Sequence, residues 1–374
     1  MYVLCGQVDD SIVYAKQCAE KGLPVVLFGS YPWNRLDSGD EERFGDRLIH
    51  RVGCWAAVGA VVDSVYHRAL SEAAVAAAAA VSQSLSTEHS GGGGIGIAAI
   101  QMCSSSDKEA NIRTIQRLCG VAVSRGASFI ALPECCLYMG SSAAETVASA
   151  EDITTSKYLD LLTDMAVSNH VFLSIGSVHE RRDDAGEGGK ISNTQLLISP
   201  HGVRVAKYRK THLFDSPRAG LFESALTVAG DSLHVVDCSI ATVGLSVCYD
   251  LRFPEVFSRL RSQGAEIITA PSAFTCETGS AHWLTLCRAR AVETQCYLIA
   301  AAQAGRHNAK RCSHGQTVII SPWGDVLAEL PSFEEGSDTG LDIEGVAVAV
   351  FDRSFLERVR EGMPVHSHRR PELY

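Results

Sequence analysis

Three residues that lie far apart in the chain have side chains suited to nucleophilic chemistry, and each lies beside an apolar run. Glu134 follows FIALP, Lys210 lies within KYRKTHLFD, and Cys248 ends the run TVGLSVC. A thiol at a strand end, facing backbone N–H groups, is expected to have a lowered pKa and to act as a nucleophile. A carboxylate just beyond an apolar strand is half-desolvated, which raises its pKa and makes it a better base near neutral pH. An inward-pointing lysine would stabilise developing negative charge.

Each of these residues also has a plain structural interpretation. Glu134 could be a surface carboxylate at a strand end, KYRKTHLFD could be a solvated loop, and Cys248 could be a buried core thiol. Among the basic residues of that segment, Lys207, Arg209 and Lys210, the last is followed by apolar and aromatic residues and is the best candidate to point inward. The functional interpretation gains weight because all three candidates lie next to predicted strand ends.

The elements that must position these residues are short apolar strands with helices between them. Several of the strands are continuously apolar, as strands covered on both faces should be. Ser106 and Glu109 match a capping box that opens a helix, and Pro254–Glu255 suits the first turn of another helix. Many strands with few helices predict a layered α/β sandwich. The segments predicted as strands are IGIAAIQ, FIALPE, VFLSIGSV, TQLLISP, TVGLSVC, EIITAPS, YLIAAAQ, QTVIISP and GVAVAVF.

The N-terminal part of the chain has a different pattern. Residues 1–85 alternate strand-like and helix-like segments, which predicts a small α/β extension, and the Gly-rich end of 86–94 predicts a flexible linker before a domain over 95–374. The stretch VDDSIVYAKQCAEKGLPVVLFGSYPWNR resembles the C-terminal end of haloacid-dehalogenase-like phosphatases, with Asp9 and Asp10 as the acidic pair. The nucleophilic Asp-x-Asp motif of that family is missing, so we expect a non-catalytic extension.

Composition excludes several classes of function. The 374 residues are 46% hydrophobic and carry a net charge of −10, so a large core is expected and no basic surface for nucleic acid or membranes. No apolar run is long enough for a spanning helix, and MYVLCGQVDD resembles neither a secretory signal nor a transit peptide. The thirteen cysteines are scattered without a C-x-x-C pair, which indicates reduced thiols and no metal site. We therefore expect a cytoplasmic protein, with a mitochondrial pool left open.

The segments LPE, YRKTHLFD and CYDLRFPE resemble the three signature segments of the nitrilase, or carbon–nitrogen hydrolase, superfamily. The resemblance extends over 95–374 and implies a four-layer α-β-β-α sandwich without a cofactor or metal, assembled as a homodimer or higher homo-oligomer. It implies that Glu134 is the general base, Lys210 the oxyanion stabiliser and Cys248 the nucleophile. A second family glutamate corresponds to Glu223 in GLFESALTVAG. Glu223 would hold Lys210 in place or position Glu134 and the amide nitrogen, or it could be a structural ion-pair partner.

Further segments narrow the resemblance to one branch of the superfamily. PSAF…TGSAHW, RARAVETQCYLIAAAQAGRHNAKR, SPWGDV and PVHSHRRPELY are similar to the Nit branch, whose members act as deaminated-glutathione amidases. This implies a thiol-dependent amidase that forms a thioester on Cys248 and releases 2-oxoglutarate and Cys-Gly. The omega-amidase branch, which acts on 2-oxoglutaramate, shares CYD-x-RFPE but is less similar around AQAGRHNAKR and at the C-terminus; another hydrolase of small carboxylate-bearing amides also stays open.

Two alternatives lie outside this superfamily. A non-catalytic scaffold would not need Glu134, Lys210 and Cys248 together. A Cys-His protease would leave the glutamate and the lysine unexplained, and no histidine environment in the sequence resembles such a dyad. The amidase interpretation accounts for all three residues.

Arg252, four residues past Cys248, is the main candidate for substrate recognition. A 2-oxo acid amide carries a carboxylate, and a guanidinium group binds a carboxylate through two parallel hydrogen bonds. The resemblance ties this position to small dicarboxylate-type acyl groups. The alternative is a salt bridge from Arg252 to Asp250 or Glu255.

Three other residues are candidates for substrate contacts. The backbone N–H of Tyr249 is expected to help Lys210 hold the oxyanion. Thr275 and His282, both in SAFTCETGSAHW, are candidates to line the pocket. For His282 a buried hydrogen-bonding role is favoured over a catalytic one.

Overall fold

The computed structural model describes residues 2–4, 25–27, 94–182, 189–334 and 343–373. The chain divides into two compact units, Met1–Gly91 and Gly92–Tyr374. In the first unit, β1 (Tyr2–Leu4) and β2 (Val25–Leu27) pair in parallel, within the region predicted to be a small α/β extension. The helices predicted there, the Gly-rich linker and the Asp9–Asp10 pair lie outside the described residues. The domain limits drawn from the sequence stay a prediction.

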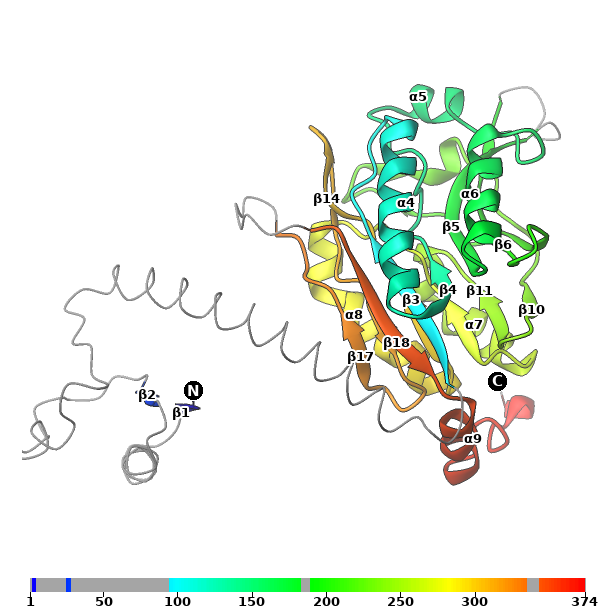
Figure 1. The fold of residues 1–374 in the computed structure, drawn as a ribbon, viewed down its shortest axis with the longest axis vertical. Helices are drawn as coiled ribbons and strands as arrows, with labels where there is room; N and C mark the ends of the chain where they lie inside the picture. The colour runs from blue at the N-terminus through cyan, green and yellow to red at the C-terminus, as the bar shows by residue number, and fades with distance from the viewer. Residues whose placement is uncertain (1, 5–24, 28–93, 183–188, 335–342, 374) are drawn as a thin grey trace, which may run out of the picture. The chain divides into compact units, whose positions relative to one another are not determined.

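The second unit contains two six-stranded sheets (Figure 1). Each sheet mixes parallel and antiparallel pairs; β3, β4 and β5 are parallel in the first, as are β11, β12 and β13 in the second. Parallel neighbours place their carboxyl ends at the same edge, which is where the candidate residues follow their strands. In spatial order the first sheet is β18 (Gly345–Phe351), β3 (Ile95–Gln101), β4 (Ala127–Ala131), β5 (Phe172–Arg181), β6 (Ile191–Ile198) and β7 (Arg204–Arg209). The second is β10 (Val235–Asp237), β11 (Thr242–Leu245), β12 (Ile267–Thr269), β13 (Tyr297–Ala300), β16 (Val318–Ile320) and β17 (Val326–Glu329).

Strands β3, β4 and β5 of the first sheet are buried on both faces over most of their length, as their apolar runs predict. Side chains alternate along β3: Ile97 and Ala99 belong to the core that joins the two sheets, whereas Ala98 and Ile100 pack in the core beneath α4 and α6. Helices α7 and α8 contribute to the first of these cores and contact the second sheet. The layers are therefore helix, sheet, sheet and helix, and the predicted four-layer sandwich is confirmed.

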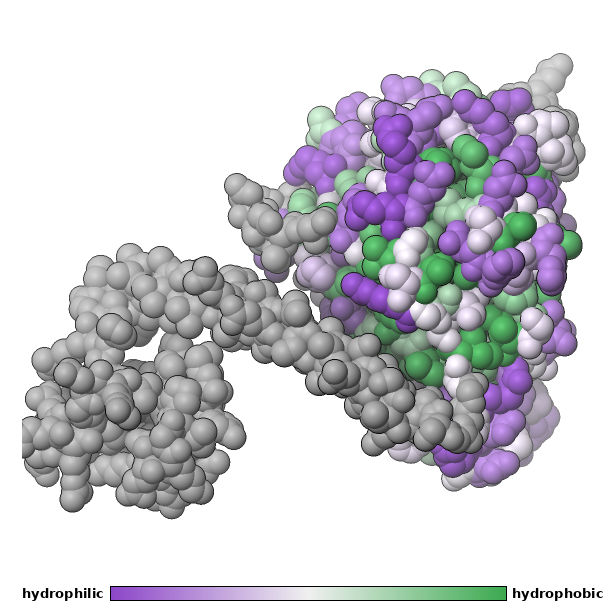
Figure 2. Space-filling model, viewed as in Figure 1, coloured by the Kyte–Doolittle hydropathy of each residue, from purple (hydrophilic) through white to green (hydrophobic). Residues whose placement is uncertain are grey.

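Helix α4, which covers the first sheet, is amphipathic. In α4 the buried residues Ile112, Ile115 and Cys119 recur at helical spacing, and the outer side of this helix is hydrophilic (Figure 2). No helix in the described ranges is both long and apolar enough to cross a membrane. The helices are α4 (Lys108–Ser124), α5 (Ala143–Ala148), α6 (Lys157–Ser168), α7 (Pro254–Ser262), α8 (Cys276–Thr294) and α9 (Arg353–Gly362), with 3₁₀ turns at Glu223–Ala225, Cys248–Arg252 and Pro371–Leu373.

Two local details concern the helix starts predicted from the sequence. The predicted capping box of Ser106 and Glu109 is wrong, because Asp107 is the N-cap and its carboxylate accepts the Ala110 N–H at 2.8 Å. Aspartate caps a helix as well as serine does, so the helix begins later than the motif suggested. The start of α7 at Pro254 is confirmed.

Two short hairpins stand outside the main sheets and shape the site. One is formed by β8 (Asp215–Ser216) and β9 (Leu221–Phe222), and the other by β14 (Ala304–Asn308) and β15 (Arg311–His314). The first returns the chain from the end of β7 toward Lys210. The second follows β13 and lies close to the loop after β3, since Ala304 N–H donates to the Met102 carbonyl at 2.9 Å.

Candidate active site

The structure brings Glu134, Lys210 and Cys248 together from both sheets. Glu134 follows β4, Lys210 follows β7 directly, and Cys248 follows β11 of the second sheet. Lys210 Nζ lies 3.0 Å from Glu134 Oε1, and Cys248 lies close enough to both residues that their charges shift the pKa of its thiol. Glu134 is 3% exposed and Lys210 2% exposed, so the two charges are held in a low-dielectric environment. The surface-residue and solvated-loop interpretations therefore do not describe these side chains.

The alternation of side chains along β7 explains why one lysine of the segment is buried and its neighbour is not. Lys207 and Arg209 lie on the side that pairs with Glu180, at 3.7 Å and 2.6 Å. Tyr208 and Lys210 lie on the opposite, buried side. The prediction that Lys210 points inward is confirmed.

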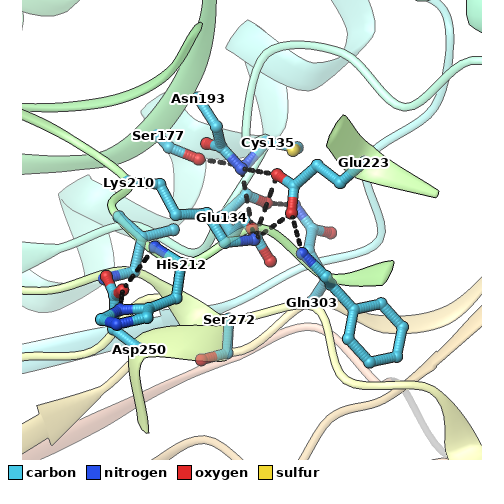
Figure 3. Close-up of polar contacts among 12 residues, drawn as sticks. Glu134, Cys135, Ser177, Asn193, Lys210, His212, Glu223, Asp250, Ser272 and Gln303 are labelled. Atoms are coloured by element: carbon cyan, nitrogen blue, oxygen red, sulfur yellow. Dashed lines mark hydrogen bonds and ion pairs between the residues drawn. The ribbon is translucent and has the colours of Figure 1, made fainter. Parts of the chain in front are cut away.

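Glu223 joins this group through the β8–β9 hairpin (Figure 3). Its two carboxylate oxygens lie 3.1 Å and 2.8 Å from Lys210 Nζ, and Oε2 also accepts the Phe214 N–H at 2.8 Å. Lys210 is thus held between two carboxylates, those of Glu134 and Glu223. An ammonium group fixed in this way cannot swing away from the reacting atoms.

Asn193 is a member of the site that sequence reasoning missed. It lies on β6, and its Nδ2 donates to Glu134 at 2.9 Å and to Glu223 at 3.1 Å, while its carbonyl accepts the Lys210 N–H at 2.9 Å. The strand ISNTQLLI is entirely buried although half of its residues are polar. Buried polar side chains need hydrogen-bond partners, so this polar run within an apolar strand is the signal that could have found Asn193.

Asp250 is a second residue that the sequence did not identify as part of the site. Its buried carboxylate accepts hydrogen bonds from Tyr208 Oη at 2.6 Å, the Val247 N–H at 2.9 Å and the His212 N–H at 3.1 Å, with His212 Nδ1 at 2.8 Å. Asp250 therefore ties the segment that carries Lys210 to the turn that carries Cys248. Figure 3 shows Asp250 bonded to His212, two residues after Lys210, and we assign Asp250 the role of positioning both segments.

The turn that carries Glu134 is held against the neighbouring strand. Gln303 Nε2 donates to the Glu134 carbonyl at 2.9 Å, and the Cys135 N–H donates to Ser177 Oγ at 3.0 Å. Gly176 is required where the two segments cross, because a Cβ there would lie 1.9 Å from the Leu132 carbonyl oxygen. The carboxylate is thus aimed by backbone contacts on both sides.

Cys248 stands in a strained turn beyond the end of its strand. Strand β11 ends at Leu245, earlier than predicted, but the Ser246 and Cys248 N–H groups continue the pairing with Thr269 and Pro271 at 3.1 Å and 2.9 Å. Cys248 itself has a backbone φ of 49°, a left-handed conformation that residues other than glycine rarely adopt. Such strain, held by the surrounding structure, is typical of functional sites.

The protonation states differ from those predicted. Burial raises the pKa of Glu134, but the Lys210 ammonium and the Cys248 thiol together lower it by a larger amount. The pKa of Glu134 therefore lies below the ordinary 4.5. Burial and the Glu134 carboxylate raise the pKa of the Cys248 thiol well above 9.0, although Lys210 opposes them. The predictions of a raised glutamate pKa and a lowered thiol pKa are therefore wrong for the free protein. Sequence position could not reveal that the two groups share one buried site with a cation.

Lys210 stays charged despite its burial. Burial alone would lower its pKa, but the carboxylates of Glu134 and Glu223 raise it well above the ordinary 10.5. The free site thus holds a neutral thiol beside a carboxylate and an ammonium group. This arrangement can transfer a proton from sulfur to the carboxylate as the sulfur attacks an electrophile.

Arg252 lies beside the nucleophile turn without a carboxylate partner in the described part of the chain. Its guanidinium carbon is 5.9 Å from the ring centre of Tyr249 and 5.2 Å from that of Phe274, and Nη1 is 3.3 Å from His282 Nδ1. The alternative of a salt bridge to Asp250 or Glu255 does not occur. Rings beneath a guanidinium hold its plane and leave its N–H edge available.

The other three residues predicted to contact the substrate, Tyr249, His282 and Thr275, lie in different surroundings. Tyr249 follows Cys248 directly, and its ring packs edge-on against Phe214 at 5.1 Å. His282 is exposed on α8, so the prediction that it is buried is wrong; it does make a hydrogen-bonding contact, to Arg252. Thr275 is the N-cap of α8 and its Oγ1 accepts the Thr278 N–H at 3.2 Å, which is a structural role. A substrate contact of Thr275 stays a prediction.

Comparisons with known proteins agree with this site. The sequence profile named carbon-nitrogen hydrolase matches residues 96–361. The deaminated glutathione amidase of Homo sapiens is 42% identical over 282 residues, covering 74% of this chain and 83% of that protein. The protein of the same name from Dictyostelium discoideum is 37% identical and covers 73% of this chain and 93% of its own.

Solved structures resemble the same part of the chain. The C. elegans NitFhit protein has 38% identity and a TM-score of 0.68, covering 75% of this chain and 66% of that chain. Saccharomyces cerevisiae Nit3, a member of branch 10 of the nitrilase superfamily, has 27% identity and a TM-score of 0.64. The match covers 74% of this chain and 96% of Nit3. This chain therefore belongs to the carbon–nitrogen hydrolase family and is a hydrolase of amide carbon–nitrogen bonds.

Proposed function

We propose that this chain is a deaminated-glutathione amidase, which uses Cys248 as its nucleophile and releases 2-oxoglutarate and Cys-Gly. The observation that carries the proposal is the group in which the buried Lys210 lies between Glu134 and Glu223, close enough to Cys248 that the charges of Glu134 and Lys210 act on its thiol. The choice of substrate is supported by the relatives named deaminated glutathione amidase, which this chain covers over most of their length.

The first half-reaction begins with the neutral thiol. As sulfur attacks the amide carbonyl carbon, its proton passes to the nearby Glu134 carboxylate. The negative charge moves to the carbonyl oxygen, where the Lys210 ammonium and the Tyr249 N–H stabilise it. A preorganised donor of this kind contributes about 2.7–4 kcal/mol to the transition state. Because the thiol pKa is high, the thiolate forms only as the new C–S bond develops.

Collapse of the tetrahedral species breaks the carbon–nitrogen bond. Glu134 returns its proton to the departing nitrogen, and Cys-Gly leaves while a thioester remains on Cys248. A water molecule then attacks the thioester carbon and gives a proton to Glu134. When the C–S bond breaks, that proton returns to sulfur, and 2-oxoglutarate leaves with the thiol restored.

Glu223 acts on this cycle through Lys210. Its carboxylate makes the closest contact with the ammonium, at 2.8 Å, and receives the Phe214 N–H as well. It therefore holds Lys210 in position as Glu134 gains and loses a proton. Asn193 bridges the two carboxylates and has the same positioning role.

Arg252 would bind the carboxylate of the 2-oxo acid part of the substrate. Its place beside Tyr249, on the turn that carries the nucleophile, supports a contact with the acyl group. His282 contacts the same guanidinium and would restrict its orientation. This pair would select amides whose acyl part ends in a carboxylate.

The experiment that tests the proposal compares hydrolysis of deaminated glutathione and 2-oxoglutaramate by the full chain, with Cys248→Ala as the control. We expect much the higher kcat/KM for deaminated glutathione and no turnover by the variant. A preference for 2-oxoglutaramate would identify an omega-amidase. If neither amide reacts, the proposal is refuted.

The setting of the enzyme is also part of the proposal. We infer a cytoplasmic enzyme from its many thiols and acidic charge, with a mitochondrial pool left open, and a homo-oligomer from its resemblance to the superfamily. Sedimentation of the purified chain tests the oligomer, and microscopy of the tagged full chain tests the compartment. A monomer, or a secreted protein, would refute the respective expectation.

A further inference from the structure

We propose that Arg311 binds the carboxylate of the departing amine, which is the glycine carboxylate of Cys-Gly if the proposed function is correct. The inference rests on that function and deepens it, because it names the residue that distinguishes a dipeptide leaving group from ammonia. Arg311 begins β15, at the end of the β14–β15 hairpin. No role was predicted for it from the sequence.

The pairing of the hairpin defines which way Arg311 faces. Successive residues of a strand alternate, so Arg311 and Ser313 share one face and Cys312 lies on the other. Ser313 Oγ lies 2.8 Å from His307 Nε2, and His307 Nδ1 lies 2.9 Å from the Ser104 carbonyl. The face that carries Arg311 is therefore the one turned toward the loop after β3.

That loop is bonded to the turn that carries the base. Ser104 Oγ donates to the Cys136 carbonyl at 3.0 Å, and Gln303 Nε2 contacts both Ser104 Oγ and the Glu134 carbonyl, at 2.6 Å and 2.9 Å. Asn308, the pairing partner of Arg311, donates to the Gly140 carbonyl at 3.2 Å. The hairpin is thus fixed beside the segment that follows Glu134.

The charge of Arg311 acts on titratable groups on the Glu134 side of the site. After burial and the nearer groups, its guanidinium helps to lower the pKa of Glu134. Burial first, and Arg311 second, lower the pKa of His179 to about 4. His179 Nε2 in turn lies 3.5 Å from the sulfur of Cys135, next to the base.

Arg311 is half-buried and forms no ion pair with any carboxylate among the described residues. By contrast, the buried Lys210 has two carboxylate partners. A guanidinium presents a planar fork of donors, and its preferred partner is a carboxylate bound through two of them. The group is therefore available to an anionic part of a ligand that enters the site.

The mechanism identifies which part of the substrate this is. Glu134 gives its proton to the leaving nitrogen, so the amine must depart on the Glu134 side, where Arg311 lies. Arg252 lies with Tyr249 on the nucleophile side, where the acyl group stays. Deaminated glutathione has a carboxylate at each end, and the two arginines would bind one each. The ammonia that leaves 2-oxoglutaramate has no carboxylate for Arg311.

A competing explanation is that Arg311 only keeps Glu134 ionised. The two explanations differ in a measurable way. A residue that tunes the base affects every substrate equally, because every amide uses the same proton transfer. A residue that binds the leaving group affects only amides whose leaving group has a carboxylate.

The test measures kcat/KM of the full chain and of Arg311→Gln with three amides. These are deaminated glutathione, the same compound with its glycine carboxylate converted to an amide, and 2-oxoglutaramate. We expect Arg311→Gln to lose about 10- to 100-fold with deaminated glutathione, the range for a lost hydrogen bond to a charged group, and to be unchanged with the other two. Arg306→Gln, on the opposite face of the hairpin, is the matched control and should leave all three values unchanged.

The outcomes separate this inference from the proposed function. If the wild type hydrolyses deaminated glutathione but Arg311→Gln loses activity equally with all three amides, or with none, the inference is overturned and the function stands. If the wild type hydrolyses only 2-oxoglutaramate, both are refuted. Activity of the variant with 2-oxoglutaramate also shows that it has folded, and Arg311→Lys, which keeps the charge but not the fork, should recover part of the loss.

Discussion

The two cationic regions of the site differ in how their charges are satisfied. Lys210 is completely enclosed and contacts Glu134 and Glu223 within 3.1 Å. Arg252 and Arg311 are half-buried, and neither has an ion-pair partner in the described part of the chain. The difference indicates that the two regions have separate functions, catalysis for the group around Lys210 and ligand binding for the arginines. The protein completes the inner group by itself, so that the reacting atoms are preorganised, whereas the arginines need a ligand to complete them.

This comparison makes a general expectation about variants. Changes to the inner group should lower kcat with every substrate, because its contacts act on the atoms that react. Changes to the arginines should mainly raise KM, and only for substrates that carry the matching carboxylate.

The largest effect is expected for Lys210→Met, which removes the ammonium group but keeps much of its volume. We expect kcat/KM to fall at least about 10²- to 10³-fold, since an oxyanion donor is lost. The pKa of Glu134 should also rise, because Lys210 is the main group that lowers it. Lys207→Met, on the Glu180 side of the same strand, is the control and should retain activity. Equal losses in both variants would contradict the special role of the inner group.

A smaller effect is expected for Glu223→Gln, which removes the charge but keeps the shape. Lys210 loses a charged partner, so kcat should fall about 10- to 100-fold while KM changes little. Steady-state kinetics at several pH values would measure both, with Asp215→Asn, an exposed carboxylate on the same hairpin, as the control. A change confined to KM would show that Glu223 binds substrate instead.

Arg252→Gln should weaken substrate binding without stopping the chemistry. We expect KM for 2-oxo acid amides to rise about 10-fold or more, as for a lost charged hydrogen bond, with kcat little affected. Single-turnover measurements separate binding from chemistry. If kcat falls instead, Arg252 belongs with the inner group, and the division between the two regions fails.

The smallest effect is expected from pH. The active form has an ionised Glu134 and a neutral Cys248 thiol. The pKa of Glu134 lies below 4.5, so the base is lost only as pH falls through that lowered value; the pKa of the thiol lies above 9.0, so its proton is lost only as pH rises through that raised value. The plot of kcat/KM against pH should therefore be flat across the neutral range, and alkylation of Cys248 in the free enzyme should be slow there. An inflection near neutral pH would indicate a thiolate–acid pair and reverse the assigned proton positions.

Much of the fold and the three central residues could be predicted from the sequence. Continuous apolar runs such as IGIAAIQ and GVAVAVF predict strands covered on both faces, because burial and side-chain alternation are local properties of a strand. Glu134 and Cys248 were found because each follows such a run, and Lys210 because it lies in a basic segment that continues into apolar and aromatic residues. The inward direction of Lys210 follows from the two-residue period of β7.

What only the tertiary structure decided are the contacts between these segments. Asn193 bridges two carboxylates, Asp250 joins two loops, and the hairpin of Arg311 lies beside the segment that follows Glu134. No periodic pattern in the sequence reveals these contacts, because they depend on which strands become neighbours in the folded chain. The protonation states of Glu134 and Cys248 were likewise decided only by the tertiary structure. A pKa in a buried site is a balance between desolvation and nearby charges, and the charges that lower that of Glu134 and raise that of Cys248 come from segments brought together only by folding.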